Sequence, residues 1–151
     1  MGMTALRPRA TGHPGYSETR PRDEETAPIA RNLVRAACAT WGVTDDATEA
    51  AALVLVELVS NAVRHGMGPS IRLIVDRPSS GQLYLAVVDR SALKFPELRD
   101  PGDDESSGRG LLLIEAMSER WGYERLGPTT RPWGKRVWAV LRTEEEAVAA
   151  P

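Results

Sequence analysis

The residues best suited to chemistry lie in the stretch ELVSNAVRHG, residues 57–66. Glu57, Asn61 and His65 follow one another at four-residue intervals, so on a helix they form a polar line along one face. Apolar residues fill most of the remaining circumference from residue 53 to 63, which indicates a well-covered helix. Buried Glu and Asn side chains require polar partners, and Mg²⁺ with a phosphate could supply them, because Mg²⁺ prefers oxygen ligands. The alternative is a solvent-exposed stripe on an amphipathic helix.

Two further stretches carry groups that could bind a ligand. Asp89 closes the apolar run QLYLAVVD; an Asp there commonly forms a turn, but its carboxylate could instead accept a hydrogen bond from an exocyclic amine such as that of adenine. In SSGRGLLLI, residues 106–114, Gly108 and Gly110 let the backbone approach a ligand closely. Free amides at the start of the following helix attract anions, and Arg109 adds positive charge. An ordinary glycine-rich loop before a helix would have the same sequence.

Neither of the common nucleotide-binding motifs is present. The nearest match to a phosphate loop, GPTTRPWGKR, has six residues between its glycines and Arg136 where Ser or Thr is required. Alternating strand–helix units are missing around the glycines, which excludes a Rossmann domain.

Helices and strands predicted from the periodicity must position these residues. Two helices come first, one from Thr26 to Gly42 and one that Thr44 caps and Gly66 ends as a C′ residue. The later elements are strands at 70–76 and 82–89, a loop at 90–107, a helix at 108–122 and a hairpin at 123–127 and 134–143. This order suits an α+β fold, a two-layer α/β sandwich with helices on one face of a mostly antiparallel sheet.

The domain boundaries follow from the ends of this pattern. Residues 1–24 contain prolines, glycines and arginines without a hydrophobic period, so we expect a flexible N-terminal tail, although part of 14–22 could add an edge strand. Residues 25–143 form the one domain, and 144–151 form an acidic C-terminal tail. The loop at 90–107 is long enough to be a functional lid or a disordered segment.

Composition limits the expected partners and location. The 151 residues are 42% hydrophobic and 26% charged with a net charge of -2, which is typical of one globular domain and gives no reason to expect nucleic acid or an anionic membrane as partner. The single cysteine, Cys38, excludes an intramolecular disulfide, and its apolar helical context predicts a small buried residue. No signal peptide or membrane-spanning run is visible, so we expect a cytoplasmic protein.

Taken in order, these motifs resemble the ATP-binding domain shared by gyrase, Hsp90, histidine kinases and MutL proteins. The N box, G1 box and G2 box of that superfamily correspond to Glu57-x-x-x-Asn61, Asp89 and Gly108-x-Gly110-Leu111. The long loop corresponds to the ATP lid, and the resemblance implies a Bergerat-type ATP-binding fold. Within the superfamily, ELVSNAVRHG, GRGLLLIEAMSERWG and GKRVWAVL are similar to the small bacterial anti-sigma-factor serine/threonine kinases and their stand-alone ATP-binding relatives.

The resemblance implies a role for each matching residue. Glu57 would act as general base toward an attacking hydroxyl, and Asn61 would hold the Mg²⁺ that bridges the phosphates of ATP (or ADP). Asp89 would read the adenine amino group. The phosphates would be bound through backbone amides of the G2 box, by Gly108, Arg109, Gly110 and Leu111. His65 is expected to be structural or to face the phosphates.

Two positions depart from the superfamily pattern. The G1 box usually continues Asp-x-Gly-x-Gly, whereas this chain reads Asp89-Arg90-Ser91-Ala92-Leu93. Ser91 can be tolerated among the nucleotide-binding residues, but loss of both glycines restricts the lid and weakens nucleotide binding. The last strand often carries Thr after Gly, where its hydroxyl supports the adenine-binding Asp. Here Lys135 follows Gly134, and it could reach a phosphate or face solvent.

Two functions remain open. One is an ATP-dependent serine/threonine kinase that phosphorylates a small anti-sigma antagonist and otherwise sequesters a sigma factor; relatives of this kind commonly form homodimers. The retained Glu57 favours it. The other is a nucleotide-responsive protein-binding module without phosphoryl transfer, which the missing G1 glycines favour. Direct binding to nucleic acid or to a membrane is expected for neither.

Overall fold

The computed structural model describes residues 7–8, 12–92 and 106–143. Within these ranges the chain forms three helices and six strands. The helices are α1 (Thr26–Trp41), α2 (Asp45–His65) and α3 (Ser106–Met117). The strands are β1 (Arg7–Pro8), β2 (Gly15–Pro21), β3 (Ser70–Ser79), β4 (Gln82–Asp89), β5 (Arg120–Leu126) and β6 (Gly134–Arg142).

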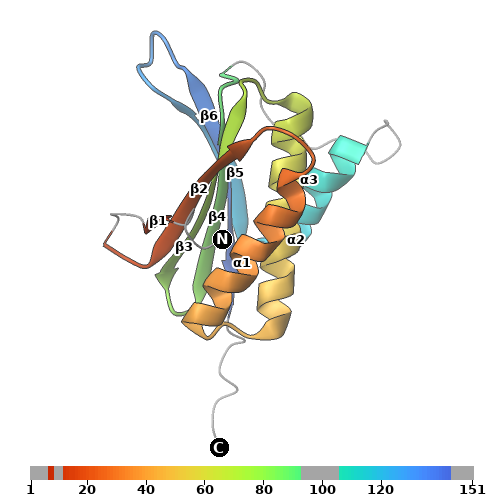
Figure 1. Ribbon diagram of the computed structural model, residues 1–151, viewed down its shortest axis with the longest axis vertical. Helices are drawn as coiled ribbons and strands as arrows, with labels where there is room; N and C mark the ends of the chain where they lie inside the picture. The colour runs from red at the N-terminus through yellow and green to blue at the C-terminus, as the bar shows by residue number, and fades with distance from the viewer. Residues whose placement is uncertain (1–6, 9–11, 93–105, 144–151) are drawn as a thin grey trace, which may run out of the picture.

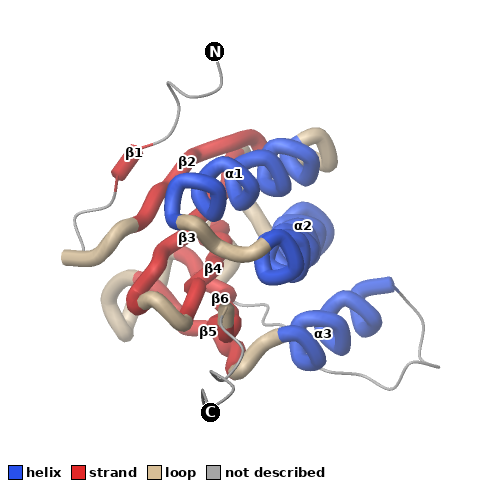
Figure 2. Tube along the Cα trace, turned by 90° about the horizontal axis from the view of Figure 1, so that it is seen from below, coloured by secondary structure: helices blue, strands red, loops and turns tan. Residues whose placement is uncertain are grey.

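The strands form one antiparallel sheet in the order β1-β2-β3-β4-β6-β5. The three helices lie together on one face of this sheet, with α2 between α1 and α3 (Figures 1 and 2). The predicted α+β fold, a two-layer sandwich covered by helices on one face, is confirmed. No helix in the described part of the chain is long and apolar enough to cross a membrane.

Strand alternation builds the core beneath the helices. The inward positions predicted for β3, β4 and β6 are buried in one apolar cluster, Ile71, Leu73, Val75, Leu83, Leu85, Val87, Val137, Ala139 and Leu141. Leu33 and Val34 from α1 join this cluster, as do Leu55 and Leu58 from α2. Because each fully buried side chain of this size contributes about 1.5–3 kcal/mol, the interface fixes α2 against the strands that carry the site.

The N-terminal strand β2 corrects the predicted flexible tail at residues 1–24. Residues 15–21 pair with β3 along the whole strand, so the edge-strand alternative for this stretch is the correct one. The sequence of β2 lacks a clear alternation of apolar and polar residues, because one of the positions that face the helices is polar. This residue, Glu18, is buried and pairs with Arg20. Tyr16, on the same face, stacks on Trp41 of α1 with ring centroids 5.6 Å apart. The predicted loop residues 93–105 and the C-terminal tail lie outside the described residues.

The helix ends agree with the predicted caps, with one exception. The Thr44 hydroxyl accepts a hydrogen bond from the Ala47 amide at 3.3 Å, and Gly42 ends α1 with a left-handed φ of 72°. Gly66 has an extended backbone with a φ of -83°, so it is not the left-handed C′ glycine that the sequence predicts. Glycine is instead required here for close packing, because a Cβ on Gly66 would lie 2.9 Å from Cγ of Asp89.

The buried thiol of Cys38 yields a test of the core. Cys38 is fully buried on α1, and burial raises the pKa of its thiol more than a hydrogen bond with Thr48 and the charge of Arg77 lower it. Since the thiolate is the reactive form, we expect the native protein to react with a thiol-specific reagent at neutral pH far more slowly than the protein unfolded in guanidinium chloride. Equal rates in the two states would contradict this placement.

Candidate functional site

The predicted site residues lie in two groups, one around Asp89 and one where Glu57 and Asn61 face α3. Asp89 ends β4 directly opposite Lys135, the second residue of β6. The C-terminal end of α2 reaches the same place, because a Cβ on Gly66 would lie only 2.9 Å from Cγ of Asp89. The site is therefore assembled from the ends of α2, β4 and β6 and from the first turns of α3, which packs beside α2.

A buried ion pair joins the ends of β4 and β6. Asp89 is 2% exposed and Lys135 is 4% exposed. The Lys135 ammonium nitrogen lies 3.1 Å from Oδ1 and 3.0 Å from Oδ2 of Asp89. Taking two charges out of water is costly, and close geometry with further hydrogen bonds is needed to offset it. The solvent-facing alternative for Lys135 is therefore wrong, and its ammonium group instead contacts the carboxylate that is predicted to read adenine.

Ser91 contacts the same carboxylate through its backbone N–H. Its N–H donates to Oδ1 of Asp89 at 2.7 Å, and its carbonyl accepts a hydrogen bond from the Lys135 ammonium at 3.4 Å. Ser91 is 1% exposed, and its Oγ has no hydrogen-bond partner among the described residues. Buried hydroxyls without a partner are uncommon in proteins, so this group is one that a bound ligand could satisfy.

Two glycines allow α2 and β6 to approach Asp89 closely. A Cβ on Gly66 would lie 2.9 Å from Cγ of Asp89, and a Cβ on Gly134 would lie 2.3 Å from the Asp89 carbonyl oxygen. Both distances lie inside normal van der Waals contact, and the opposing atoms belong to the Asp89 side chain and the Asp89 backbone. A side chain at either position would therefore displace the strand or helix end that holds the ion pair.

Arg22 holds the chain that leaves α2, and no sequence pattern indicated this role, because Arg22 lies in the predicted tail. Its side chain donates hydrogen bonds of 2.7 Å to the carbonyl oxygens of Val63 and Gly68. Its backbone amide donates one of 3.0 Å to the carbonyl oxygen of Pro69. On the other side of this loop, the Arg90 amide donates to the Met67 carbonyl at 3.1 Å. The loop that follows α2 is thus fixed between the start of α1 and the residue next to Asp89.

Glu57 and Asn61 face the first turns of α3. A Cβ on Gly110 would lie 2.7 Å from Oε2 of Glu57 and 3.8 Å from Oδ1 of Asn61. Both side chains are half-buried, whereas His65, the third member of the predicted polar line, is exposed at the end of α2. The structure therefore brings the N box and the G2 box together and leaves His65 outside, and the exposed-stripe alternative is wrong for Glu57 and Asn61.

The side-chain oxygen of Asn61 fits a Mg²⁺ ion that shares its coordination with phosphates. Mg²⁺ is usually bound by one or two protein oxygens together with substrate phosphates and waters. Across residues 12–92 and 106–143, no three His, Cys, Asp or Glu side chains group as metal ligands, so the metal would be held jointly with the nucleotide. The Asn61 amide nitrogen is buried and has no partner among these residues, which also indicates a polar ligand.

Helix α3 provides the backbone of the G2 box. The amides of the first three residues of a helix have no intrahelical acceptor, and in α3 these are residues 106–108. The amide of Gly108 is therefore available to a phosphate, whereas those of Arg109, Gly110 and Leu111 lie in the hydrogen-bonded part of the helix. Leu111 is buried in the core and anchors α3, while Gly110 contributes space beside the N box.

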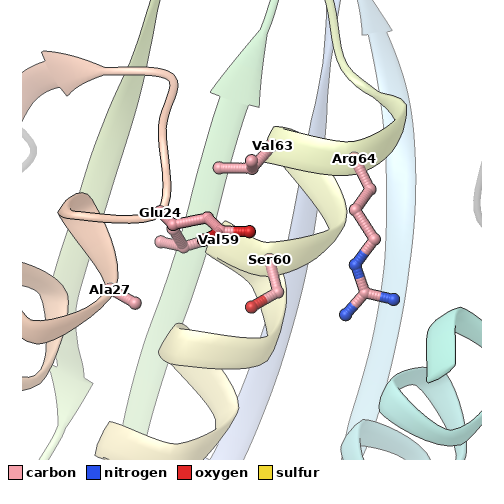
Figure 3. Close-up of a pocket in the computed structure, with 6 residues that line it drawn as sticks. All are labelled: Glu24, Ala27, Val59, Ser60, Val63 and Arg64. Atoms are coloured by element: carbon pink, nitrogen blue, oxygen red, sulfur yellow. The ribbon is translucent and has the colours of Figure 1, made fainter.

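A separate cavity lies between α1 and α2 (Figure 3). Its volume is about 220 Å³, and it is lined by Glu24, Ala27, Val59, Ser60, Val63 and Arg64. None of these is a predicted site residue. The cavity occupies the α1 side of α2, whereas Glu57 and Asn61 face α3, so the assignments made for the site do not depend on it.

Removing one partner of the buried ion pair is expected to destabilise the protein strongly. Lys135→Met leaves the Asp89 carboxylate buried without its cation, at a cost of about 3–5 kcal/mol. Combining it with Asp89→Asn removes both charges and should recover most of the loss. Urea unfolding measures both variants, with Arg142→Met as control, because Arg142 forms an exposed pair with Glu119 and its loss should cost below about 1 kcal/mol. Equal losses in the single and double variants would contradict the pairing.

Comparison with known proteins agrees with this geometry. No curated protein matches the sequence. The family model of the histidine kinase-like ATPase domain matches residues 20–141, which is more than half of the chain and includes every predicted site residue from Glu57 to Lys135. The expected superfamily is confirmed, while the match does not separate anti-sigma-factor kinases from other members. The chain therefore belongs to the histidine kinase-like ATPase domain family, a family of ATP-binding domains.

Proposed function

We propose that this protein is an anti-sigma factor that binds ATP and phosphorylates a small antagonist protein on Ser or Thr. In the absence of the antagonist it would sequester a sigma factor and so regulate transcription, as a homodimer. The observation that carries the proposal is the position of Glu57, a half-buried carboxylate that faces Gly110 beside the Asn61 oxygen. A domain that only binds nucleotide does not need a carboxylate at this point.

The side chains of α2 supply the chemistry in this proposal. Glu57 accepts the proton of the attacking hydroxyl or orients that hydroxyl in line with the transferred phosphoryl group. Asn61 would hold Mg²⁺ through its side-chain oxygen, and the metal would supply positive charge beside the phosphates. Because Gly110 has no side chain, the Glu57 carboxylate lies directly against the backbone of α3, where the phosphates would be bound.

The ends of α3 and β4 bind the two ends of the nucleotide. The free amide of Gly108 at the start of α3 donates to a phosphate oxygen, and the positive end of the helix dipole adds to this attraction. Asp89 accepts a hydrogen bond from the adenine amine. Lys135, which is predicted to contact nucleotide, acts on it through Asp89, because its ammonium group is already paired with that carboxylate.

The alternative function is a nucleotide-responsive module that binds protein partners without phosphoryl transfer. One observation favours it. The G1 box has Ser91 and Leu93 where the superfamily has glycine, and Ser91 is fixed by two hydrogen bonds, to Asp89 and from Lys135. A chain segment held in this way moves less readily when nucleotide binds, which would slow turnover more than binding.

Binding of Mg-ATP should stabilise the protein against heat. A ligand at a hundredfold excess over its Kd stabilises a native protein by about 2.7 kcal/mol, so the melting temperature should rise with nucleotide concentration. Differential scanning calorimetry with ATP, ADP and no nucleotide measures this, with Asn61→Ala expected to reduce the shift. The absence of any shift with either nucleotide would exclude both functions.

Phosphoryl transfer separates the kinase from the binding module. With labelled ATP and candidate antagonist proteins, Glu57→Gln should lower the rate of transfer by about 10²–10⁴-fold, the usual contribution of a general base, while nucleotide affinity is retained. Glu49→Gln is the matched control, since Glu49 lies on the same helix in an exposed pair with Arg35. Transfer that survives Glu57→Gln would refute the base assignment, and absence of transfer in the unmodified protein would favour the module.

A further inference from the structure

Two large hydrophobic side chains are exposed beside the end of β4. Met67, in the loop after α2, is 58% exposed, and Trp133, just before β6, is 45% exposed. Arg90, which is also exposed, contacts both residues. Its N–H donates to the Met67 carbonyl at 3.1 Å, and its guanidinium carbon lies 5.3 Å from the centre of the Trp133 ring, within cation–π distance. We call Met67, Arg90 and Trp133 the exposed cluster.

The backbone holds the side chains of the exposed cluster in place. A Cβ on Gly68 would lie 2.8 Å from Cγ of Arg90, and a Cβ on Gly127 would lie 2.4 Å from Cδ1 of Trp133. Both side chains therefore pack directly on glycine backbone. The Trp133 N–H donates to the Leu126 carbonyl at 2.9 Å, which fixes the turn between β5 and β6. Side chains that are ordered before binding lose less entropy when a partner binds.

Positive charge is concentrated around the exposed cluster. Three segments surround it, residues 64–68, 89–91 and 124–136. They hold six Lys and Arg residues and two carboxylates, a formal net charge of +4, in a chain whose total is -2. Both carboxylates already form ion pairs with cations of the same segments. The charge that this region presents to a partner is therefore positive, and it complements an acidic surface.

The position and composition of the exposed cluster suit contact with another protein. The turn between β5 and β6 projects beyond the neighbouring strand ends (Figure 1). Trp and Arg are enriched at the hot spots of protein interfaces, and the flexible side chain of Met adapts to the shape of a partner.

We propose that the exposed cluster is the docking surface for a short acidic segment of a partner protein. Carboxylates of that segment pair with the Arg90 guanidinium, and an apolar side chain beside them packs on Trp133 and Met67. The inference goes beyond the proposed function, because no side chain of the exposed cluster is assigned to the nucleotide.

Single-stranded nucleic acid is the other anionic polymer that this positive charge could attract. Proteins that bind it present open aromatic rings on which successive bases stack. Here the Arg90 guanidinium lies over the Trp133 ring, and the exposed cluster contains one aromatic residue. A protein segment is therefore the better match.

Selection of short random peptides displayed on phage, with the full chain as target and no nucleotide present, tests this inference. The enriched peptides should carry Asp or Glu beside a large apolar residue. Fluorescence anisotropy should show that they bind wild type, more weakly as added salt screens the charges. Trp133→Ala and Arg90→Glu should each weaken this binding by about 30-fold or more, the loss expected at a hot spot.

Two control variants change the same kinds of residue elsewhere on the surface. Leu53→Ala removes another exposed apolar side chain, on α2, and Arg31→Glu makes the same charge reversal on α1. Both should keep the wild-type affinity. Circular dichroism verifies that each variant is folded. Where Arg90→Glu is not, Arg131→Glu reverses a charge in the projecting turn and should weaken peptide binding in its place.

The inference is overturned if no peptide is enriched, if the enriched peptides lack acidic residues, or if Trp133→Ala and Arg90→Glu bind them as tightly as wild type. It is also overturned if oligothymidylate binds with a loss in both variants while the acidic peptides do not bind. No nucleotide is present in these measurements, so they are independent of the melting test with Mg-ATP. A chain that binds the acidic peptides but shows no shift with nucleotide would refute the proposed function alone.

Discussion

The buried ion pair between Asp89 and Lys135 is the interaction on which the site depends. It forms across the β4–β6 ladder, where the two residues are direct partners, so a one-residue slip of either strand would turn one of the two charges to the opposite face of the sheet. The pair allows a carboxylate to remain in an otherwise apolar interior. The Ser91 amide, Gly66 and Gly134 are all arranged around it, and each would lose its present geometry without it.

Helix α2 sets the separation between the two ends of the site. Glu57 faces α3, and Gly66 lies against Asp89. At a rise of 1.5 Å per residue these points are about 13 Å apart along the helix. Because the core fixes α2 against β4 and β6, this separation is determined by packing between the layers rather than by loops. Helix α2 therefore sets the distance between Glu57, the proposed proton acceptor, and Asp89, the carboxylate proposed to bind adenine.

The sequence was sufficient for the three helices and for strands β3 to β6, because these elements leave periodic signals. The alternating residues of β3, β4 and β6 predicted their buried faces, and the resemblance carried by Glu57, Asn61 and Gly110 placed the N box and the G2 box in one site, where they lie side by side. Contacts that leave no periodic pattern in the sequence could not be predicted. β2 was hidden because a buried Glu takes an inward position, and Lys135 could be placed only when its strand partner was known.

The three hydrogen bonds of Arg22 have a consequence for how the domain opens. Helix ends normally fray, because their last carbonyl groups lack intrahelical partners, but here the Val63 carbonyl is bonded to a residue from the start of the chain. The last turn of α2 can therefore open only together with the junction of β2 and α1, and these segments form one cooperative unit in local unfolding. Strand β2 lies outside the proposed nucleotide site, yet the Arg22 hydrogen bonds link its end to the last turn of α2. The two segments are therefore protected together against local unfolding.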